Sequence, residues 1–161
     1  HDGEEHVMLQ SNKDVRTHDE KPEMKAKEIA DKAIEGIKEK GVEFTFINFA
    51  NPDMVGHTAN VPAIITAVET VDRELKRVIE ALDEVGGTAV IIADHGNCET
   101  MINPDGSPNT AHTKNPVPFI LVDAKKRKIK SGILSDIAPT ILDLLEIVVP
   151  EKMTQNSLIS T

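Results

Sequence analysis

The chain has 161 residues, 39% of them hydrophobic and 28% charged, with a formal net charge of −9 at pH 7. A chain of this length can bury about 70% of the surface that its unfolded form exposes, so one globular domain is the default expectation. The negative charge argues against a nucleic-acid partner, because phosphate backbones are held by clustered Lys and Arg. We interpret the short basic run from Lys125 to Lys130 as a solvated turn.

Cysteine content and apolar run lengths give a first view of the cellular setting. Cys98 is the only cysteine, which excludes an internal disulfide. Because the sequence offers it no separate base partner, we interpret Cys98 as a buried small hydrophobe rather than a nucleophile or a metal ligand. No amino-terminal apolar segment has the length of a signal peptide or a membrane span, so we expect a cytoplasmic protein without a membrane partner.

Hydrophobic periodicity predicts helices and strands that alternate along the chain. Asn60 is a plausible N-cap for the longest helix, and Ser135 for the last one. Pro118 suits the start or the edge of a strand better than a central position. The predicted elements are a short strand at 7–10, a helix at 22–40, a strand at 42–50, a helix from 61 to the Gly86-Gly87 pair, strands at 88–93 and 117–122, and a helix at 135–145.

This order of elements predicts the fold class α/β, with three layers and a mainly parallel sheet flanked by helices. The run at 88–93 is apolar throughout, as in a central strand that is covered on both faces. The long helix carries an apolar stripe that we expect to pack against the sheet. The stripe consists of Val61, Ile64, Ile65, Val68, Val71, Leu75, Val78, Ile79 and Leu82.

Five side chains of metal-ligand type lie on predicted loops that follow or connect strands, where α/β proteins place their chemistry. Asp94 and His95 end the apolar run at 88–93, and Gly96 lets the backbone turn so that both can share one site. Taken singly, Asp53 and His57 are better explained as polar side chains exposed to solvent, and His112 as a structural residue. Their combination with Asp94 and His95 points to a metal site.

The charges of these side chains predict divalent cations. Two carboxylates about 4 Å apart repel by roughly 4 kcal/mol at an effective dielectric of about 20. A divalent cation bound between them offsets this repulsion. Mixed carboxylate and imidazole ligation suits Mn²⁺, Zn²⁺ or Co²⁺, whereas Mg²⁺ normally takes more oxygen ligands. Five ligand-type residues exceed the needs of one catalytic ion, so we infer two ions and phosphoryl transfer. No serine lies beside the proposed ligands in the sequence. Ser107, in a loop between two of the motifs, is a weak candidate for the nucleophile.

Several segments closely resemble one family, cofactor-independent (2,3-bisphosphoglycerate-independent) phosphoglycerate mutase. The resemblance covers essentially the whole chain, and the segment around Asp53 is its most specific part. The segments are NFANPDMVGHT at 48–58, ADHGN at 93–97, TAHT at 110–113, NPVP at 115–118 and SDIAPT at 135–140, with the stretch 17–24 that contains PEM and the stretch 150–158.

The resemblance implies membership of the alkaline-phosphatase superfamily. It also implies a glycolytic isomerase that interconverts 3-phosphoglycerate and 2-phosphoglycerate through a phosphoserine intermediate, commonly with two Mn²⁺ ions. Carried over by motif, Asp53, His57 and His112 would hold one ion. Asp94 and His95 would hold the other.

The same resemblance implies that residues 1–161 are the carboxy-terminal portion of the metal-binding phosphatase-like domain. The segment with the nucleophilic serine and the inserted transferase domain have no counterpart in this sequence, so no catalytic residue is assigned within the chain. We therefore expect the isolated chain to be inactive. We also expect self-association or a rearranged packing, because missing strands would leave a sheet edge or an apolar face uncovered.

Two alternatives stay open. A related two-metal phosphatase or phosphopentomutase would share Asp94-His95-Gly96, although the Asn51-Pro52-Asp53-Met54 context favours the glycerate enzyme. A non-catalytic metal-binding unit is the other alternative, because the nucleophile is missing.

Overall fold

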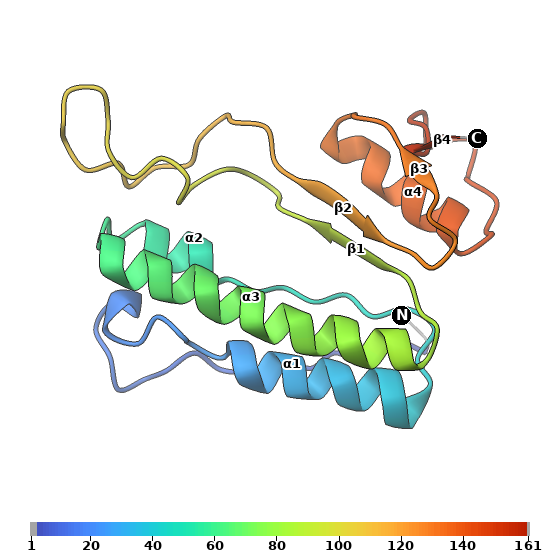
Figure 1. The fold of residues 1–161 in the computed structure, drawn as a ribbon, viewed down its shortest axis with the longest axis horizontal. Coiled ribbons are helices and arrows are strands. Elements are labelled where there is room, and N and C mark those ends of the chain that lie inside the picture. The colour runs from blue at the N-terminus through green and yellow to red at the C-terminus, as the bar shows by residue number, and fades with distance from the viewer. Residues whose placement is uncertain (1–2, 161) are drawn as a thin grey trace. The chain divides into compact units, whose positions relative to one another are not determined.

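A computed structural model of the chain describes residues 3–160 and divides it into two compact units (Figure 1). The first unit comprises His1–Val85 and His95–Asn115, and the second comprises Gly86–Asp94 and Pro116–Thr161. Across residues 3–160, every helix is too short or too polar to cross a membrane.

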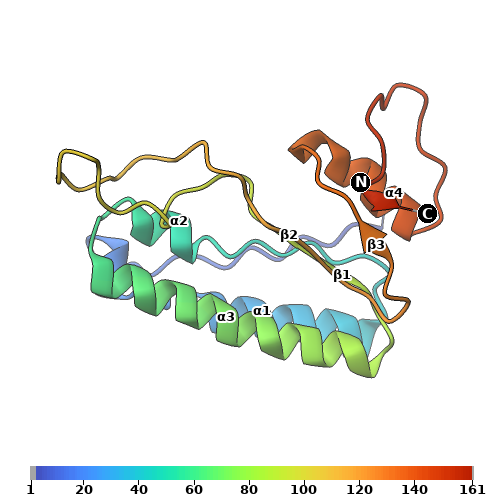
Figure 2. The ribbon, with the colours of Figure 1, turned by 45° about the horizontal axis from the view of Figure 1, so that its top comes forward.

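Two long helices form the body of the first unit. α1 (Ala26–Glu35) continues into a π-helical turn (Gly36–Lys40) that ends at Gly41, whose φ of 60° is the left-handed conformation that glycine adopts readily. α3 (Val61–Glu84) begins at Asn60, whose side chain accepts a hydrogen bond from the Ala63 backbone N–H, so the predicted cap is confirmed. The helices run side by side in the same direction (Figures 1 and 2).

Small side chains line the contact between these helices. Ala30 and Ala33 of α1 form one buried cluster with Val78 of α3. A second cluster joins α3 to the short helix α2 (Asn51–Gly56) and contains Val55, Ala63, Ile64 and Ala67. Alanine at these positions lets the helix backbones approach closely, which large aliphatic side chains would prevent.

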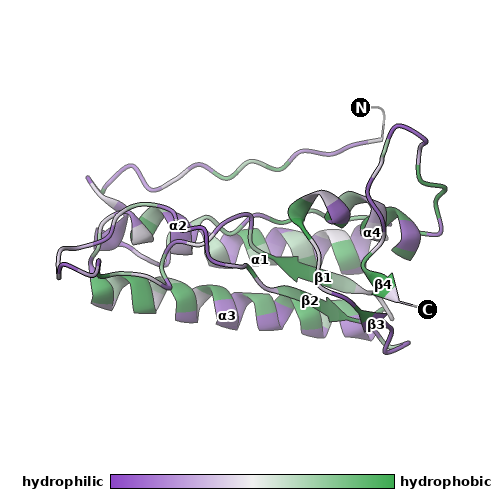
Figure 3. Ribbon diagram, turned by 90° about the horizontal axis from the view of Figure 1, so that it is seen from above, coloured by the Kyte–Doolittle hydropathy of each residue, from purple (hydrophilic) through white to green (hydrophobic). Residues whose placement is uncertain are grey.

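The predicted stripe of α3 is wrong in part. Val61, Ile65 and Val68 are 36%, 49% and 41% exposed. The buried face of α3 is instead formed by Ala63, Ile64, Ala67, Thr70, Glu74, Val78 and Ala81. Apolar residues lie on both the buried and the exposed sides of this helix, and hydrophobic stretches recur along its length in Figure 3. Periodicity cannot tell which side meets a neighbouring helix.

A charge network around one buried carboxylate links the two helices. Glu74 is 4% exposed, and its carboxylate lies 2.5 Å from Arg77 Nη1 and 3.1 Å from Arg73 Nε. Arg77 also reaches Asp31 of α1, with 2.6 Å between Nη2 and Oδ1. The network satisfies a carboxylate that would otherwise be costly to bury.

The segment 42–50 was predicted as a strand, and this prediction is wrong. Within residues 3–160 it forms no strand, and the same holds for 7–10. Ile47 and Phe49 pack against the cluster of Ala30, Ala33 and Val78, whereas Phe46 is 78% exposed. The alternating residues Val42, Phe44 and Phe46 are 45%, 51% and 78% exposed, so the alternation marks no buried face here. A strand also needs a hydrogen-bonded neighbour.

The second unit contains the strands. β1 (Ala89–Ile92) pairs with β2 (Phe119–Val122), and β3 (Lys128–Ile129) pairs with β4 (Ile159–Ser160). The predicted positions of β1 and β2 and the α/β class are confirmed. The expected mainly parallel sheet is not found in residues 3–160, because both pairs are antiparallel. Alternation along the chain does not fix strand direction, and the long excursion between β1 and β2 lets the chain return antiparallel.

The last helix of the second unit, α4 (Ile137–Leu144), confirms the helix predicted at 135–145 but not its cap. A 3₁₀ turn (Leu134–Asp136) precedes α4, and the Asp136 carboxylate, rather than Ser135, accepts the Ile133 N–H at 2.8 Å. The basic run at 125–130 starts in a turn, as expected, where Asp123 accepts the Lys125 N–H.

Candidate metal centre

Asp53 and His57 are placed by α2, a helix that the sequence analysis treated as a loop. Pro52 stands in its first turn, where the missing N–H costs nothing. The buried Asn51 side chain anchors the helix by donating to the backbone carbonyls of Pro22 at 2.9 Å and Glu23 at 2.8 Å. Residues four apart lie on one side of a helix, so His57 Nε2 is 3.2 Å from Asp53 Oδ1.

The loop at 95–115 brings two more imidazoles to this helix. Gly96 and Thr113 form an isolated antiparallel bridge in which the Thr113 N–H donates to the Gly96 carbonyl at 2.8 Å. The bridge sets His95 beside His112, and their rings stack with 3.6 Å between centroids. His112 Nε2 lies 3.0 Å from Asp53 Oδ1.

Four of the five predicted site residues therefore lie together in the first unit. His57 Nε2 and His112 Nε2 are 3.1 Å apart, and His95 Nε2 is 3.9 Å from Asp53 Oδ1. Asp53, His95 and His112 each offer one ligand atom within 4.8 Å of the others. Asp94 belongs to the second unit. The assignment of all five residues as metal ligands stays a prediction.

The hydrogen bond of His57 fixes its tautomer in a form that can bind a metal. Its Nδ1 lies 2.7 Å from the Thr110 carbonyl oxygen. Because a carbonyl oxygen can only accept a hydrogen bond, Nδ1 carries a proton, and Nε2, which faces Asp53 and His112, is the nitrogen that can bind a metal when the ring is neutral. The donor set thus suits a borderline divalent ion, with imidazole nitrogens around one carboxylate oxygen.

Local charge favours the ionised form of Asp53. Burial alone would raise the pKa of its carboxyl, but the hydrogen bond from Asn97 and the positive charges of His57, His112 and His95 together hold this pKa below its usual value. The group therefore offers an anionic oxygen ligand over the pH range in which proteins are normally studied.

Two residues behind the cluster were missed by the sequence analysis. Asn97 Nδ2 donates to Asp53 Oδ1 at 2.7 Å. Glu99 accepts hydrogen bonds from the Asn97 N–H at 2.7 Å, from Asn115 Nδ2 at 2.9 Å and from the Thr113 hydroxyl. The Thr113 hydrogen bond, supported by Asn115, lowers the pKa of Glu99 to about 2. Their only signal in the sequence is closeness to His95-Gly96.

Ser107 and Cys98, which the sequence also offered as reactive side chains, contact residues outside the proposed ligand set. The Ser107 hydroxyl donates to Asp105 Oδ1 at 2.6 Å and accepts from Asn103 within its own exposed loop. Cys98 is half-buried and packs against the cluster that contains Val55 and Ile64, and burial raises the pKa of its thiol. This packing supports the interpretation of Cys98 as a small hydrophobe.

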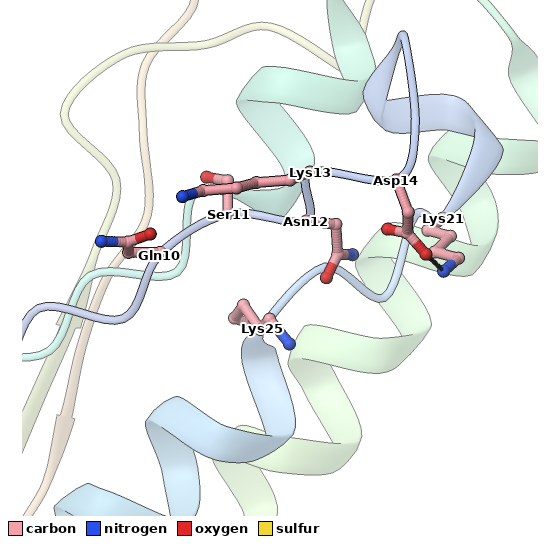
Figure 4. A pocket seen from close by; sticks show the side chains of 7 residues that line it. All are labelled: Gln10, Ser11, Asn12, Lys13, Asp14, Lys21 and Lys25. Atoms are coloured by element: carbon pink, nitrogen blue, oxygen red, sulfur yellow. Dashed lines mark hydrogen bonds and ion pairs between the residues drawn. The ribbon is translucent and has the colours of Figure 1, made fainter.

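A cavity of about 580 Å³ lies elsewhere in the first unit, along residues 10–25 (Figure 4). Its lining is polar, and one of its lysines, Lys21, is paired with Asp14. Among the residues 3–160 that the structure describes, this lining does not include Asp53, His57, His95 or His112.

Comparison with known proteins places this geometry in context. The chain is 52% identical over 158 residues to the 2,3-bisphosphoglycerate-independent phosphoglycerate mutase of Flavobacterium johnsoniae, covering 98% of this chain and 31% of that protein. It is 51% identical to the corresponding mutase of Clostridioides difficile, covering 98% of this chain and 32% of the relative. The expected resemblance is confirmed, and the chain spans about a third of the length of these relatives.

Structure comparison agrees. A structure of Leishmania mexicana phosphoglycerate mutase at low cobalt concentration matches with a TM-score of 0.85 and 32% identity, over 95% of this chain and 31% of that one. Residues 1–148 match the model of the metalloenzyme superfamily. The chain belongs to the metalloenzyme superfamily.

Proposed function

We propose that this chain supplies the divalent-metal-binding part of a 2,3-bisphosphoglycerate-independent phosphoglycerate mutase. One observation carries the proposal: His57 Nε2 and His112 Nε2 lie 3.1 Å apart, and each is within 3.2 Å of Asp53 Oδ1. Ligand atoms bound about 2.0–2.2 Å from one ion are separated by such distances. The coverage of 98% of the chain by mutases supports the choice of enzyme.

Two divalent ions are part of this proposal. Asp53, His57 and His112 are the proposed ligands of one ion, and Asp94 and His95 those of the other. Imidazole and carboxylate ligation favours Mn²⁺, with Co²⁺, Zn²⁺ and Mg²⁺ as alternatives. Bound ions would supply positive charge to a phosphoryl group in transfer. The chain's own contribution is an ionised Asp53 and a His57 tautomer fixed by the Thr110 carbonyl.

The substrates proposed for the whole enzyme are 3-phosphoglycerate and 2-phosphoglycerate, which it would interconvert through a phosphoserine intermediate. The proposed pathway is glycolysis, and the proposed location is the cytoplasm. We propose that residues 1–161 act as the carboxy-terminal portion of its phosphatase-like domain and that the nucleophilic serine comes from another segment. The Ser107 hydroxyl, engaged by Asp105 and Asn103, supports this view. The chain on its own is then expected to bind metal without mutase activity.

A chimera tests the proposal. The segment of the Clostridioides difficile mutase that matches this chain is replaced by the 161 residues, and conversion of 3-phosphoglycerate is measured with Mn²⁺. We expect activity from the chimera, and none from its Asp53→Ala version or from the 161-residue chain alone. The Glu80→Gln chimera, altered on the exposed side of α3, is the matched control and should stay active. A folded but inactive chimera would contradict the proposal.

A further inference from the structure

Asn97 contacts Asp53, the carboxylate among the proposed ligands Asp53, His57, His95 and His112. Asn97 is 7% exposed, and its Nδ2 donates to Asp53 Oδ1 at 2.7 Å and to the Asp53 carbonyl at 3.3 Å. Gly56 makes room for this side chain, because a Cβ at that position would collide with the Asn97 amide. The amide nitrogen faces Asp53, so Asn97 presents a donor to this carboxylate rather than a ligand atom.

Glu99 holds the loops that carry the imidazoles. One of its carboxylate oxygens, Oε2, accepts the Asn97 N–H, and the other accepts from Thr113 and Asn115. Thr113 directly follows His112, and its backbone is bridged to Gly96, which directly follows His95. A single carboxylate therefore fastens both histidine-bearing segments to each other.

These contacts form one continuous path from Glu99 through Asn97 to Asp53. The Glu99 carboxylate fixes the Asn97 backbone, and the Asn97 side chain fixes the rotation of the Asp53 carboxylate. A carboxylate oxygen has two lone pairs, so Asp53 Oδ1 can accept from Asn97 while it faces His57 and His112. Groups that orient ligands in this way typically change metal affinity 10–100-fold when removed.

We propose that Asn97 and Glu99 are positioning residues of the metal centre, with Asn97 orienting Asp53 and Glu99 setting the spacing of His95 and His112. The inference rests on the proposed metal-binding function and assigns roles to two residues that do not bind the ion. Glutamine at position 99 keeps the shape of the side chain but replaces one acceptor oxygen by a donor. This donor would face the N–H of Asn97 or the donors of Thr113 and Asn115.

The test measures metal binding by the 161-residue chain at a temperature at which circular dichroism shows that each variant is folded. Mn²⁺ affinity is obtained by calorimetry for the unaltered chain, Asn97→Ala, Glu99→Gln, Thr113→Val and the double variant Glu99→Gln/Thr113→Val. Glu80→Gln is the matched control, because its carboxylate is 61% exposed and lies 3.7 Å from Lys76 on the surface of α3. The visible absorption of the Co²⁺-saturated chain reports coordination geometry independently of affinity.

We expect Asn97→Ala and Glu99→Gln to weaken Mn²⁺ binding about 10–100-fold and to change the Co²⁺ spectrum, with Glu80→Gln unchanged in both. The loss in the double variant should be smaller than the two single losses combined, because Thr113 donates to the same side chain that Glu99→Gln alters. If Glu99→Gln does not fold, Thr113→Val carries the same expectation alone. Unchanged affinity and spectrum in folded variants would overturn the inference. Absence of Mn²⁺ binding by the unaltered chain would instead overturn the proposed function.

Discussion

His112 Nε2 lies 3.0 Å from Asp53 Oδ1, although the two residues come from a long loop and from a short helix. The contact makes two of the proposed ligands neighbours in space, which sequence distance alone does not require. An ion pair with a protonated histidine would also account for this distance. Metal binding and ion pairing differ in their response to pH and to mutation.

Replacing His112 by alanine should weaken Mn²⁺ binding at least about tenfold. The substitution removes one nitrogen ligand, whereas loss of a supporting hydrogen bond alone typically changes affinity 10–100-fold. His6→Ala is the matched control, because the His6 side chain is 77% exposed and is paired with Glu4 outside the cluster. Calorimetric titration at pH 7.5 measures both variants. Equal affinities of the two variants would remove His112 from the ligand set.

Mn²⁺ affinity should fall as the pH drops below about 6.5, the ordinary pKa of a histidine side chain. A protonated imidazole cannot coordinate, so binding releases protons. The lowered pKa of Asp53 keeps its carboxylate ionised through this range, so the loss is attributed to the imidazoles. Titrations at pH 5.5, 6.5 and 7.5, in buffers of different ionisation enthalpy, count the released protons. Constant affinity without proton release would mean that the histidines are not ligands.

Glu99 should contribute stability that depends on pH in the metal-free chain. Hydrogen bonds, that from Thr113 foremost, hold its pKa at about 2, against an ordinary value of 4.5. Because the folded pKa lies below the unfolded one, the contribution is complete above pH 4.5 and is lost as the pH falls from there toward 2. The difference in unfolding free energy between the chain and Glu99→Gln, measured by urea denaturation, should therefore shrink over this window. A difference that stays constant from pH 6 to 3 would contradict the assignment.

Local signals predicted the helices better than the strands. Asn60 and the two glycines after α3 mark its ends, and the positions of α1 and α3 follow from side-chain periodicity. The segment 42–50 has the alternation of a strand, but pairing depends on a neighbour that its own residues do not specify. The antiparallel pairing of β1 with β2 likewise depends on how the intervening loop returns.

The site was predictable as a set of residue types and not as an arrangement. Asp53 and His57 have the four-residue spacing of one helical turn after Asn51-Pro52, which could have revealed α2 before the structure. Asn97 and Glu99 carried no comparable signal. Their role depends on contacts with Asp53 and Thr113, which only the folded chain brings within reach.

Arg77 should contribute more to stability than its neighbour Lys76, although both are basic residues of α3. Arg77 bridges Asp31 of α1 and the buried Glu74, whereas Lys76 lies 3.7 Å from the exposed Glu80. Removing Arg77 deprives a carboxylate that is 4% exposed of its closest partner. Such losses cost about 1–3 kcal/mol, and exposed pairs contribute about 0–1 kcal/mol.

The comparison of Arg77→Ala with Lys76→Ala, by urea denaturation at 25 °C and pH 7, measures this difference directly. We expect the first variant to be less stable by about 1–3 kcal/mol and the second to stay within about 0.5 kcal/mol of the unaltered chain. The double variant Glu74→Met/Arg77→Ala should regain part of the loss, because the buried carboxylate that lost its closest partner is then also removed. Equal stability of the two single variants would show that the Arg77 network does not hold α1 against α3.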